Sequence, residues 1–170
     1  MLPNIDLRIA NMIKALEQVI LPALPREQRQ ARDQAMLVAG HLGMIGEQWK
    51  SALRYEQVSL DDLAGLARQL LPDAPELLGP RLESALAAAE ACDRVNIAAL
   101  EQANIDLGNA VDAVILGGED HAPLSQAASD AVLAYGLRHA RRERTWFKAN
   151  HLDPDRDELP AIAEIFAGAD

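Results

Sequence analysis

The sequence predicts an all-α fold, a helical bundle with four long helices and short helices that cover its ends. Apolar residues return every three or four positions along most of the chain, which is the spacing of a buried helix face. No stretch alternates apolar and polar residues as a half-buried strand does. Of the residues, 49% are hydrophobic but only 4% aromatic, which favours close packing of helices. With 170 residues, the chain predicts a single helical-bundle domain, residues 1–170.

The first helix is predicted from about Asn4 to Leu21, where Pro22 and Pro25 end it. Its apolar residues fall on one face, and polar residues such as Lys14 lie opposite. The apolar face consists of Ile9, Met12, Ile13, Leu16, Val19 and Ile20.

The second helix is predicted from Arg26 to Arg54 and carries three regularly spaced glycines, Gly40, Gly43 and Gly46. Each glycine costs roughly 1 kcal/mol relative to alanine inside a helix. Three interpretations are open: another helix approaches closely here, the helix bends, or the backbone contacts a ligand. A shorter third helix is predicted to begin at Ser59, a good N-cap, and to end near Leu70.

One long helix is predicted from Pro80 to Leu116, with Gly117 and Gly118 as its C-terminal cap. The apolar residues before Asp93 and after Asn96 stay in phase at about 100° per residue, which favours a continuous helix. On such a helix both polar residues occupy the buried stripe. The alternative is that Asp93 caps a second helix and its carboxylate is exposed.

The last long helix is predicted to start at Pro123 or Ser125 and to end near Asn150, and a short helix from Glu158 to Ala167 follows. The long helix carries a basic run, interpreted as a solvated face with ion pairs inside the chain. An acidic or phosphorylated partner is the alternative. The run consists of Arg138, Arg141, Arg142, Arg144 and Lys148.

Four polar residues are candidates for ligand binding: Asp93, Asn96, His139 and Glu143. Buried polar groups need partners, because an unpaired one costs roughly 1–3 kcal/mol. Asp93 and Asn96 therefore predict either a hydrogen-bond network that fixes helix register or a ligand site. His139 and Glu143 are four residues apart on one helix, a spacing that suits a metal, an oriented imidazole or a simple pair at a helix boundary.

The sequence offers no motif for metal or cofactor binding. Helical di-iron proteins require Glu-x-x-His pairs, and none occurs. Phosphate-binding glycine loops, G-x-S-x-G and His-Glu-x-x-His are also absent from the sequence. The single cysteine, Cys92, excludes an internal disulfide and a cysteine-rich metal site. We therefore predict no metal and no cofactor, and the sequence favours a protein that is not an enzyme.

The charge and hydropathy of the chain limit its partners. Net charge is −10 and the pI is about 4.8, which disfavours nucleic acid and anionic membranes as partners. No secretory signal is visible, and no apolar run approaches the roughly 18 residues of a membrane span. A soluble, acidic, cytoplasmic protein of bacterial type is expected.

The first third of the chain resembles a known family. The run Glu17–Leu24, with its Leu-Pro, and the apolar pattern of Gln30–Glu47 look like the opening of a family of small bacterial all-helical proteins of unknown function. That family is found beside aminoglycoside-phosphotransferase-like kinases and acyl-CoA dehydrogenases. The chain departs from it at Gly40, Gly43 and Gly46. The resemblance implies an accessory role near acyl-CoA or small-molecule metabolism and carries over no catalytic residue.

Two functions are compatible with these observations. The first is a non-enzymatic oligomeric or accessory protein, a homodimer or the partner of another protein, with its interface on the first helix or the short C-terminal helix. The second is a small-ligand-binding or metal-dependent helical-bundle enzyme. Its buried polar site would lie around Asp93, Asn96 and His139.

Overall fold

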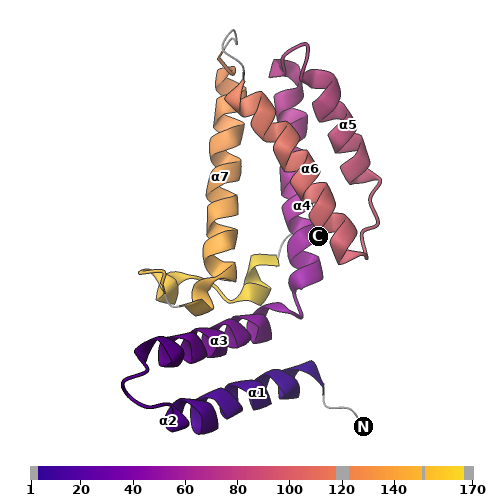
Figure 1. The fold of residues 1–170 in the computed structure, drawn as a ribbon. Coiled ribbons are helices and arrows are strands. Elements are labelled where there is room, and N and C mark those ends of the chain that lie inside the picture. Colours follow the sequence, from indigo (N-terminus) through magenta and orange to yellow (C-terminus); the bar gives the residue numbers. More distant parts are fainter. Residues whose placement is uncertain (1–3, 118–122, 151, 167–170) are drawn as a thin grey trace. The chain divides into compact units, whose positions relative to one another are not determined.

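The computed structural model describes residues 4–117, 123–150 and 152–166, and every regular element in these ranges is a helix (Figure 1). The all-α prediction is therefore confirmed. Contacts divide the chain into two compact units. Unit 1 comprises Met1–Lys50 and Glu143–Ile165, and unit 2 comprises Ser51–Arg142 and Phe166–Asp170. A single domain over residues 1–170 stays a prediction, and each unit is described by itself.

In unit 1 the chain forms a helical hairpin. Helix α1 (Ile5–Ala15) continues through a π-helical turn, η1 (Leu16–Ile20), into α2 (Leu21–Ala23), and α3 (Arg29–Gln48) returns beside α1. The predicted first helix is present, although Pro22 lies inside it. A proline ring presses on the carbonyl four residues earlier, and the wider π turn just before Pro22 relieves that contact.

Short 3₁₀ turns complete unit 1 after helix α7 (Gln126–Trp146), whose last turn belongs to this unit. They are η3 (Lys148–Asn150), η4 (Arg156–Glu158) and η5 (Ile162–Phe166). The last long helix thus ends at Trp146, four residues before its predicted end. The predicted final helix is a 3₁₀ turn, and Ala167 lies outside the described residues.

In unit 2, helices α4 (Ala52–Leu70), α5 (Gly79–Glu90) and α6 (Ile97–Leu116) pack around the main core, and the turn η2 (Leu71–Asp73) follows α4. Each fully buried leucine stabilises the fold by roughly 1.5–3 kcal/mol. The largest fully buried apolar side chains are Leu60, Leu66, Leu70, Leu82, Leu100, Leu107 and Val114.

The break predicted between Arg54 and Ser59 lies earlier, at residues 49–51, between α3 and α4. Ser59 is therefore inside α4, and its prediction as an N-cap is wrong. Tertiary contacts hold the break: the Trp49 indole N–H donates to Asp6 at 2.9 Å, and Lys50 lies 2.7 Å from the same carboxylate. No helix-breaking residue marks this position in the sequence.

Of the glycines in α3, Gly46 is the one at which an added Cβ would contact another helix. A Cβ there would lie 3.5 Å from Cγ2 of Ile9 in α1, whereas Cβ atoms at Gly40 and Gly43 would have nothing within 4 Å. A distance of 3.5 Å is an ordinary van der Waals contact, so close packing of another helix does not require glycine at Gly46, and at the other two positions an added Cβ would meet open space.

The helix predicted from Pro80 to Leu116 is two helices, because α5 ends at Glu90 and α6 begins at Ile97. The Asn96 side chain is the N-cap of α6 and accepts the N–H groups of Ala98 and Ala99. Asp93 accepts the Val95 N–H at 3.1 Å. Both side chains are exposed, so the prediction that they occupy a buried stripe is wrong. Short Asp and Asn side chains compete for backbone donors and favour such turns over a helix interior.

The C-terminal end of α6 agrees with its prediction. Gly117 has φ 59° and donates its N–H to the Ala113 carbonyl. This backbone conformation favours glycine. Gly118 lies outside the described residues.

The cap of α6 gives the first prediction. Asn96→Ala removes the acceptor for two N–H groups and is expected to lower the free energy of unfolding by about 1 kcal/mol. Asp93→Asn keeps a side-chain acceptor and is expected to stay within about 0.5 kcal/mol of wild type. Urea unfolding followed by circular dichroism measures both. Equal stability of Asn96→Ala and wild type would contradict the assignment of the cap.

Candidate functional site

A cavity of about 520 Å³ lies among α4, α6 and α7 within unit 2. Each helix contributes residues three or four positions apart, so one face of each helix meets the cavity. From α4 come Tyr55, Glu56, Ser59, Leu63 and Leu66; from α6 Asn104, Gly108, Val111, Asp112 and Ile115; and from α7 Val132, Tyr135, Gly136 and His139.

Polar groups of α4 and α6 meet at this cavity. Asn104 donates from its amide nitrogen to the Glu56 carboxylate at 2.9 Å and to the Glu56 carbonyl at 3.1 Å. Burial raises the pKa of Glu56 against the opposing effect of the Asn104 hydrogen bond. The Ser59 hydroxyl oxygen is buried and has no hydrogen-bond partner among the described residues. The cavity therefore holds a partly buried carboxyl group and an unsatisfied hydroxyl.

On α7, the rings of Tyr135 and His139 stack, with centroids 5.5 Å apart and planes 8° from parallel. Burial is the main cause that lowers the pKa of His139, and the nearby Arg142 lowers it further. His139 is therefore neutral at neutral pH. Burial raises the pKa of Tyr135, so its hydroxyl keeps its proton.

A buried ion pair fixes α7 against α4 beside this cavity. The Arg142 side chain is only 7% exposed and lies 3.1 Å from Asp62, which is 16% exposed. Arg138 binds the second oxygen of the same carboxylate at 2.7 Å. Arg142 also lies 3.5 Å from Nδ1 of His139. The predicted ion pairs of the basic run are thus present, but Arg142 does not belong to a solvated face.

The structure does not gather the four predicted site residues. His139 lines the cavity, whereas Asp93 and Asn96 are exposed in the α5–α6 turn and do not line it. Glu143 falls in unit 1; it does not line the cavity, and burial raises its pKa.

The sequence did not indicate that most of the polar residues of the lining belong to a site. Examples are Glu56, Ser59, Asp112 and Tyr135. A signal was present on α6 and α7, where Gly108 and Gly136 interrupt apolar faces at helical spacing. Such positions leave room beside a helix. On α4, the predicted start of the helix at Ser59 was wrong. Ser59 was therefore interpreted as an N-cap and not as a polar residue inside a helix.

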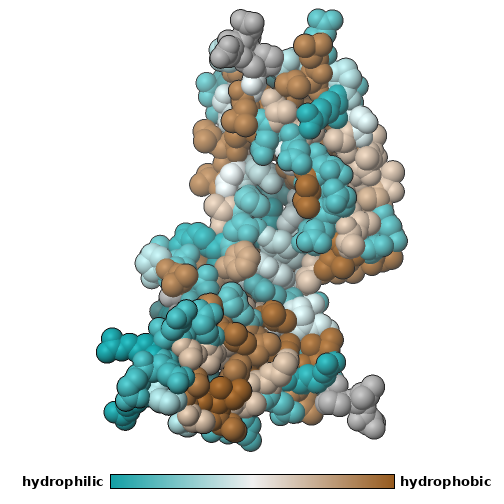
Figure 2. Space-filling model, in the orientation of Figure 1, coloured by the Kyte–Doolittle hydropathy of each residue, from teal (hydrophilic) through white to brown (hydrophobic). Residues whose placement is uncertain are grey.

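Unit 1 carries a second depression, an apolar groove of about 690 Å³ between α3 and the segment after α7. Several of its side chains are strongly exposed, such as Met36 at 60% and Leu152 at 83%. Hydrophobic side chains gather over the α1–α3 hairpin in Figure 2. The groove is lined by Asp33, Met36, Leu37, Gly40, His41, Met44, Ile45, Gln48, Phe147, Ala149, Asn150 and Leu152.

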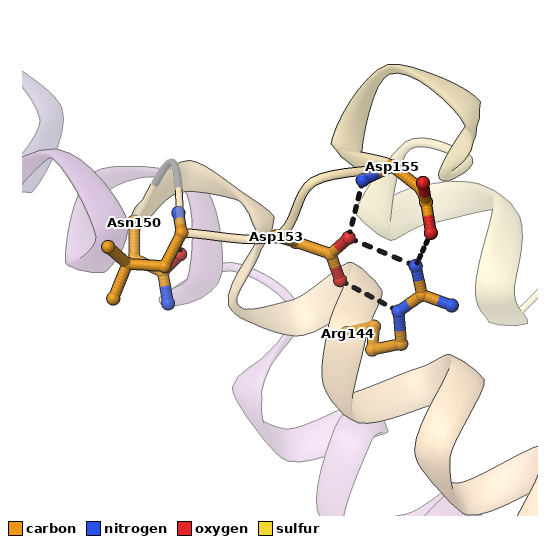
Figure 3. Close-up of polar contacts among 5 residues, drawn as sticks. Arg144, Asn150, Asp153 and Asp155 are labelled. Carbon is orange, nitrogen blue, oxygen red and sulfur yellow. Dashed lines mark hydrogen bonds and ion pairs between the residues drawn. The ribbon is translucent and has the colours of Figure 1, made fainter.

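Hydrogen bonds and ion pairs hold the C-terminal segment of unit 1 against the end of α7 (Figure 3). Arg144 donates to both oxygens of Asp153, at 2.7 and 3.0 Å, and to Asp155 at 3.0 Å. The backbone N–H of Asp155 donates to Asp153 at 2.9 Å. The Arg144 hydrogen bonds are the main cause that lowers the pKa of Asp153. We call Arg144, Asp153 and Asp155 the C-terminal clasp.

Within the described ranges, His, Cys, Asp and Glu side chains form no cluster of three or more that could hold a metal ion. None of the helices in the described part of the chain has the length and apolar content needed to cross a membrane. Comparison with known proteins finds no matching family, curated protein or solved structure.

The Arg142–Asp62 pair gives the second prediction. Asp62→Ala leaves the buried guanidinium without its main partner and is expected to lower the free energy of unfolding by about 3 kcal/mol. The matched control is Asp61→Ala, which breaks the exposed pair with Arg94 and should cost less than about 1 kcal/mol. Denaturant unfolding measures both. Equal losses of unfolding free energy in the two variants would contradict a special contribution of the buried Arg142–Asp62 pair to stability.

The C-terminal clasp gives the third prediction. Because the pKa of Asp153 is lowered on folding, its stabilising effect is present above the usual Asp value of 3.8 and lost as pH falls through the lowered pKa. The protection of the backbone amides at residues 153 and 155–158 against hydrogen exchange, relative to the unfolded chain at the same pH, should fall in that acidic range, and at neutral pH in Asp153→Asn. Asp157→Asn, at a side chain that is 95% exposed, is the control and should leave exchange unchanged. Unaltered exchange in Asp153→Asn would contradict the role of the clasp.

Proposed function

We propose that this protein is a non-enzymatic helical protein that acts by association, and that it forms a homodimer through unit 1. The observation that supports this most strongly is an imbalance of apolar burial. Among the described residues of unit 1, only Ile9, Ala35, Trp146 and Ile162 are buried apolar residues. The exposed large apolar side chains of unit 1 are Ile5, Leu7, Met12, Val19, Ile20, Met36, Leu37, Val38, Ile45, Phe147 and Leu152.

The main core contains no buried residue of unit 1, because all its buried residues lie in unit 2. Burial of apolar surface stabilises by roughly 25 cal/mol per Å², so covering several half-exposed side chains gains several kcal/mol. Soluble monomers rarely expose large contiguous apolar patches. An interface over the α1–α3 hairpin supplies the missing burial.

The composition of the apolar groove also suits a protein surface as its partner. Met36 and Met44 are flexible, polarizable side chains that adapt to an opposing helix. In a symmetric dimer, the same residues of both copies meet. The sequence led us to expect the interface on the first helix or the short C-terminal helix, whereas the groove proposed here is lined by α3 and the segment after α7.

Other parts of the functional proposal rest on the sequence alone. The absence of a catalytic motif supports a non-enzymatic role, and the acidic composition supports a cytoplasmic location without nucleic-acid or membrane partners. The family resemblance supports an accessory role near acyl-CoA or small-molecule metabolism. The alternative enzyme site around Asp93, Asn96 and His139 is not proposed further, because the first two residues do not line the cavity.

Association through unit 1 gives the fourth prediction. Wild-type protein is expected to dimerise reversibly in sedimentation velocity across a concentration series. The double substitution Met36→Glu and Ile45→Glu places charges in the apolar groove and should weaken dimerisation by about 100-fold, since each 1.4 kcal/mol changes the equilibrium tenfold.

The matched control is the double substitution Leu133→Glu and Leu137→Glu on α7. These side chains are 67% and 76% exposed and lie in unit 2. The control should dimerise as wild type does. Wild-type protein that remains monomeric at the highest concentration, or equal weakening in both variants, would contradict the proposed interface.

A further inference from the structure

We infer that the cavity among α4, α6 and α7 binds a small organic cation, an ammonium group carried on an apolar body. This site lies in unit 2 and is independent of the proposed association through unit 1. Its volume of about 520 Å³ falls within the range of small-molecule sites, roughly 300–1,000 Å³. As in such sites, apolar side chains predominate and a few polar groups converge.

The charges of the lining favour a cation. Glu56 and Asp112 are carboxylates, and no lysine or arginine belongs to the described lining. Asp62 binds two basic side chains of α7, Arg138 and Arg142. An anion in the cavity would meet two like charges, whereas an ammonium group would neutralise them. The net charge of −10 raises the local concentration of cations near the chain.

Glu56 is the residue to which we assign the ammonium group. Its carboxylate is half-buried and accepts one neutral hydrogen bond, from Asn104. An ammonium group in contact with it forms a charge-assisted hydrogen bond, which is about twice as strong as a neutral one. Burial raises the pKa of Glu56, and a bound cation would oppose that effect.

The Ser59 hydroxyl is a second, independent indication of a ligand. Ser59 lies one helix turn from Glu56 on the same face of α4, and its buried oxygen has no partner in the described ranges. Buried hydroxyl groups are normally hydrogen-bonded, so an unsatisfied one at a cavity wall indicates a missing partner. Rotation of the Ser59 side chain toward the cavity would bring this oxygen within reach of an N–H of the ammonium group.

The opposite wall suits the apolar body of the ligand. Tyr135 is held in place by stacking on His139, and both residues belong to this wall. The apolar floor is formed by Leu63, Leu66, Val111, Ile115 and Val132.

Gly136 keeps the α7 side of the cavity open. A Cβ at this position would have nothing within 4 Å, so a side chain can start there without a clash at Cβ. Gly136→Leu is expected to occupy part of the cavity, and leucine has a higher helix propensity than glycine. This substitution blocks the site without removing any polar group.

A matched series of probes tests the charge of the ligand, which gives the fifth prediction. We would titrate the full chain with 2-phenylethylamine, a cation at pH 7, and with its neutral and anionic analogues 2-phenylethanol and 3-phenylpropanoate. In ¹⁵N-resolved NMR spectra the amine should shift amides around Glu56, Asn104 and Tyr135. The amine should bind at least about tenfold more tightly than either analogue. Equal or tighter binding of an analogue, or no binding of any probe, would overturn the inference.

Variants then locate the site. Glu56→Gln should weaken amine binding by about tenfold or more, and Gly136→Leu should abolish it. Glu83→Gln makes the same charge change at an exposed position of α5 and should bind as wild type does. Thermal melts confirm that each variant is folded. Wild-type affinity in folded Gly136→Leu would overturn the site, whereas the oligomeric state of these variants reports separately on the interface of unit 1.

Discussion

The concentration of the apolar core in α4, α5 and α6 is the constraint on which the rest of unit 2 depends. These helices contain all but two of the buried core residues, and α7 adds only the small side chains Ala128 and Ala131. Two alanines bury little apolar surface. Val132 and Tyr135 of α7 also pack against the core but are only partly buried. Polar contacts therefore add to the packing of α7: Ser125 donates to Asp73 near its start, and Arg142 binds Asp62 further along. Between these contacts the helices leave the cavity.

The polar anchors also set the chemistry of the cavity. Asp62 binds both Arg138 and Arg142, so it offsets part of the positive charge on α7 near His139. Without that carboxylate, two guanidinium groups would lie near a cavity that also contains Glu56 and Asp112. The Tyr135–His139 stack lies on the same face of α7, and His139 is one helix turn before Arg142 of the ion pair. The ion pair that contributes to helix packing thus keeps the two guanidinium groups bound to Asp62. The charged residues that line the cavity itself are carboxylates.

The sequence predicted helices wherever apolar periodicity was strong, and it failed where a tertiary contact or a local side chain set the boundary. The α3–α4 break is invisible in the sequence because it depends on Trp49 and Lys50 reaching Asp6, more than forty residues away. The α5–α6 break was misread because helical phase continues across it by coincidence, while Asn96 caps α6. His139 was found at the cavity because a polar residue bordered an apolar face. Its partners on α4 and α6 are brought to it only by folding.

The turn at Asp93 to Asn96 has a consequence for the cavity that a continuous helix would lack. The Asn96 cap starts α6 afresh, so α6 packs on both α4 and α5 as a separate helix. Its core face carries Leu100, Leu107 and Val114, while Asn104, Gly108 and Ile115 line the cavity from another face. Two functions of one helix are thereby separated by side-chain size: leucines stabilise the core, and a glycine and an amide leave space and polarity for a ligand. The exposed turn residues do not line the cavity, but they set where α6 begins and thereby affect the position of the α6 residues that line it.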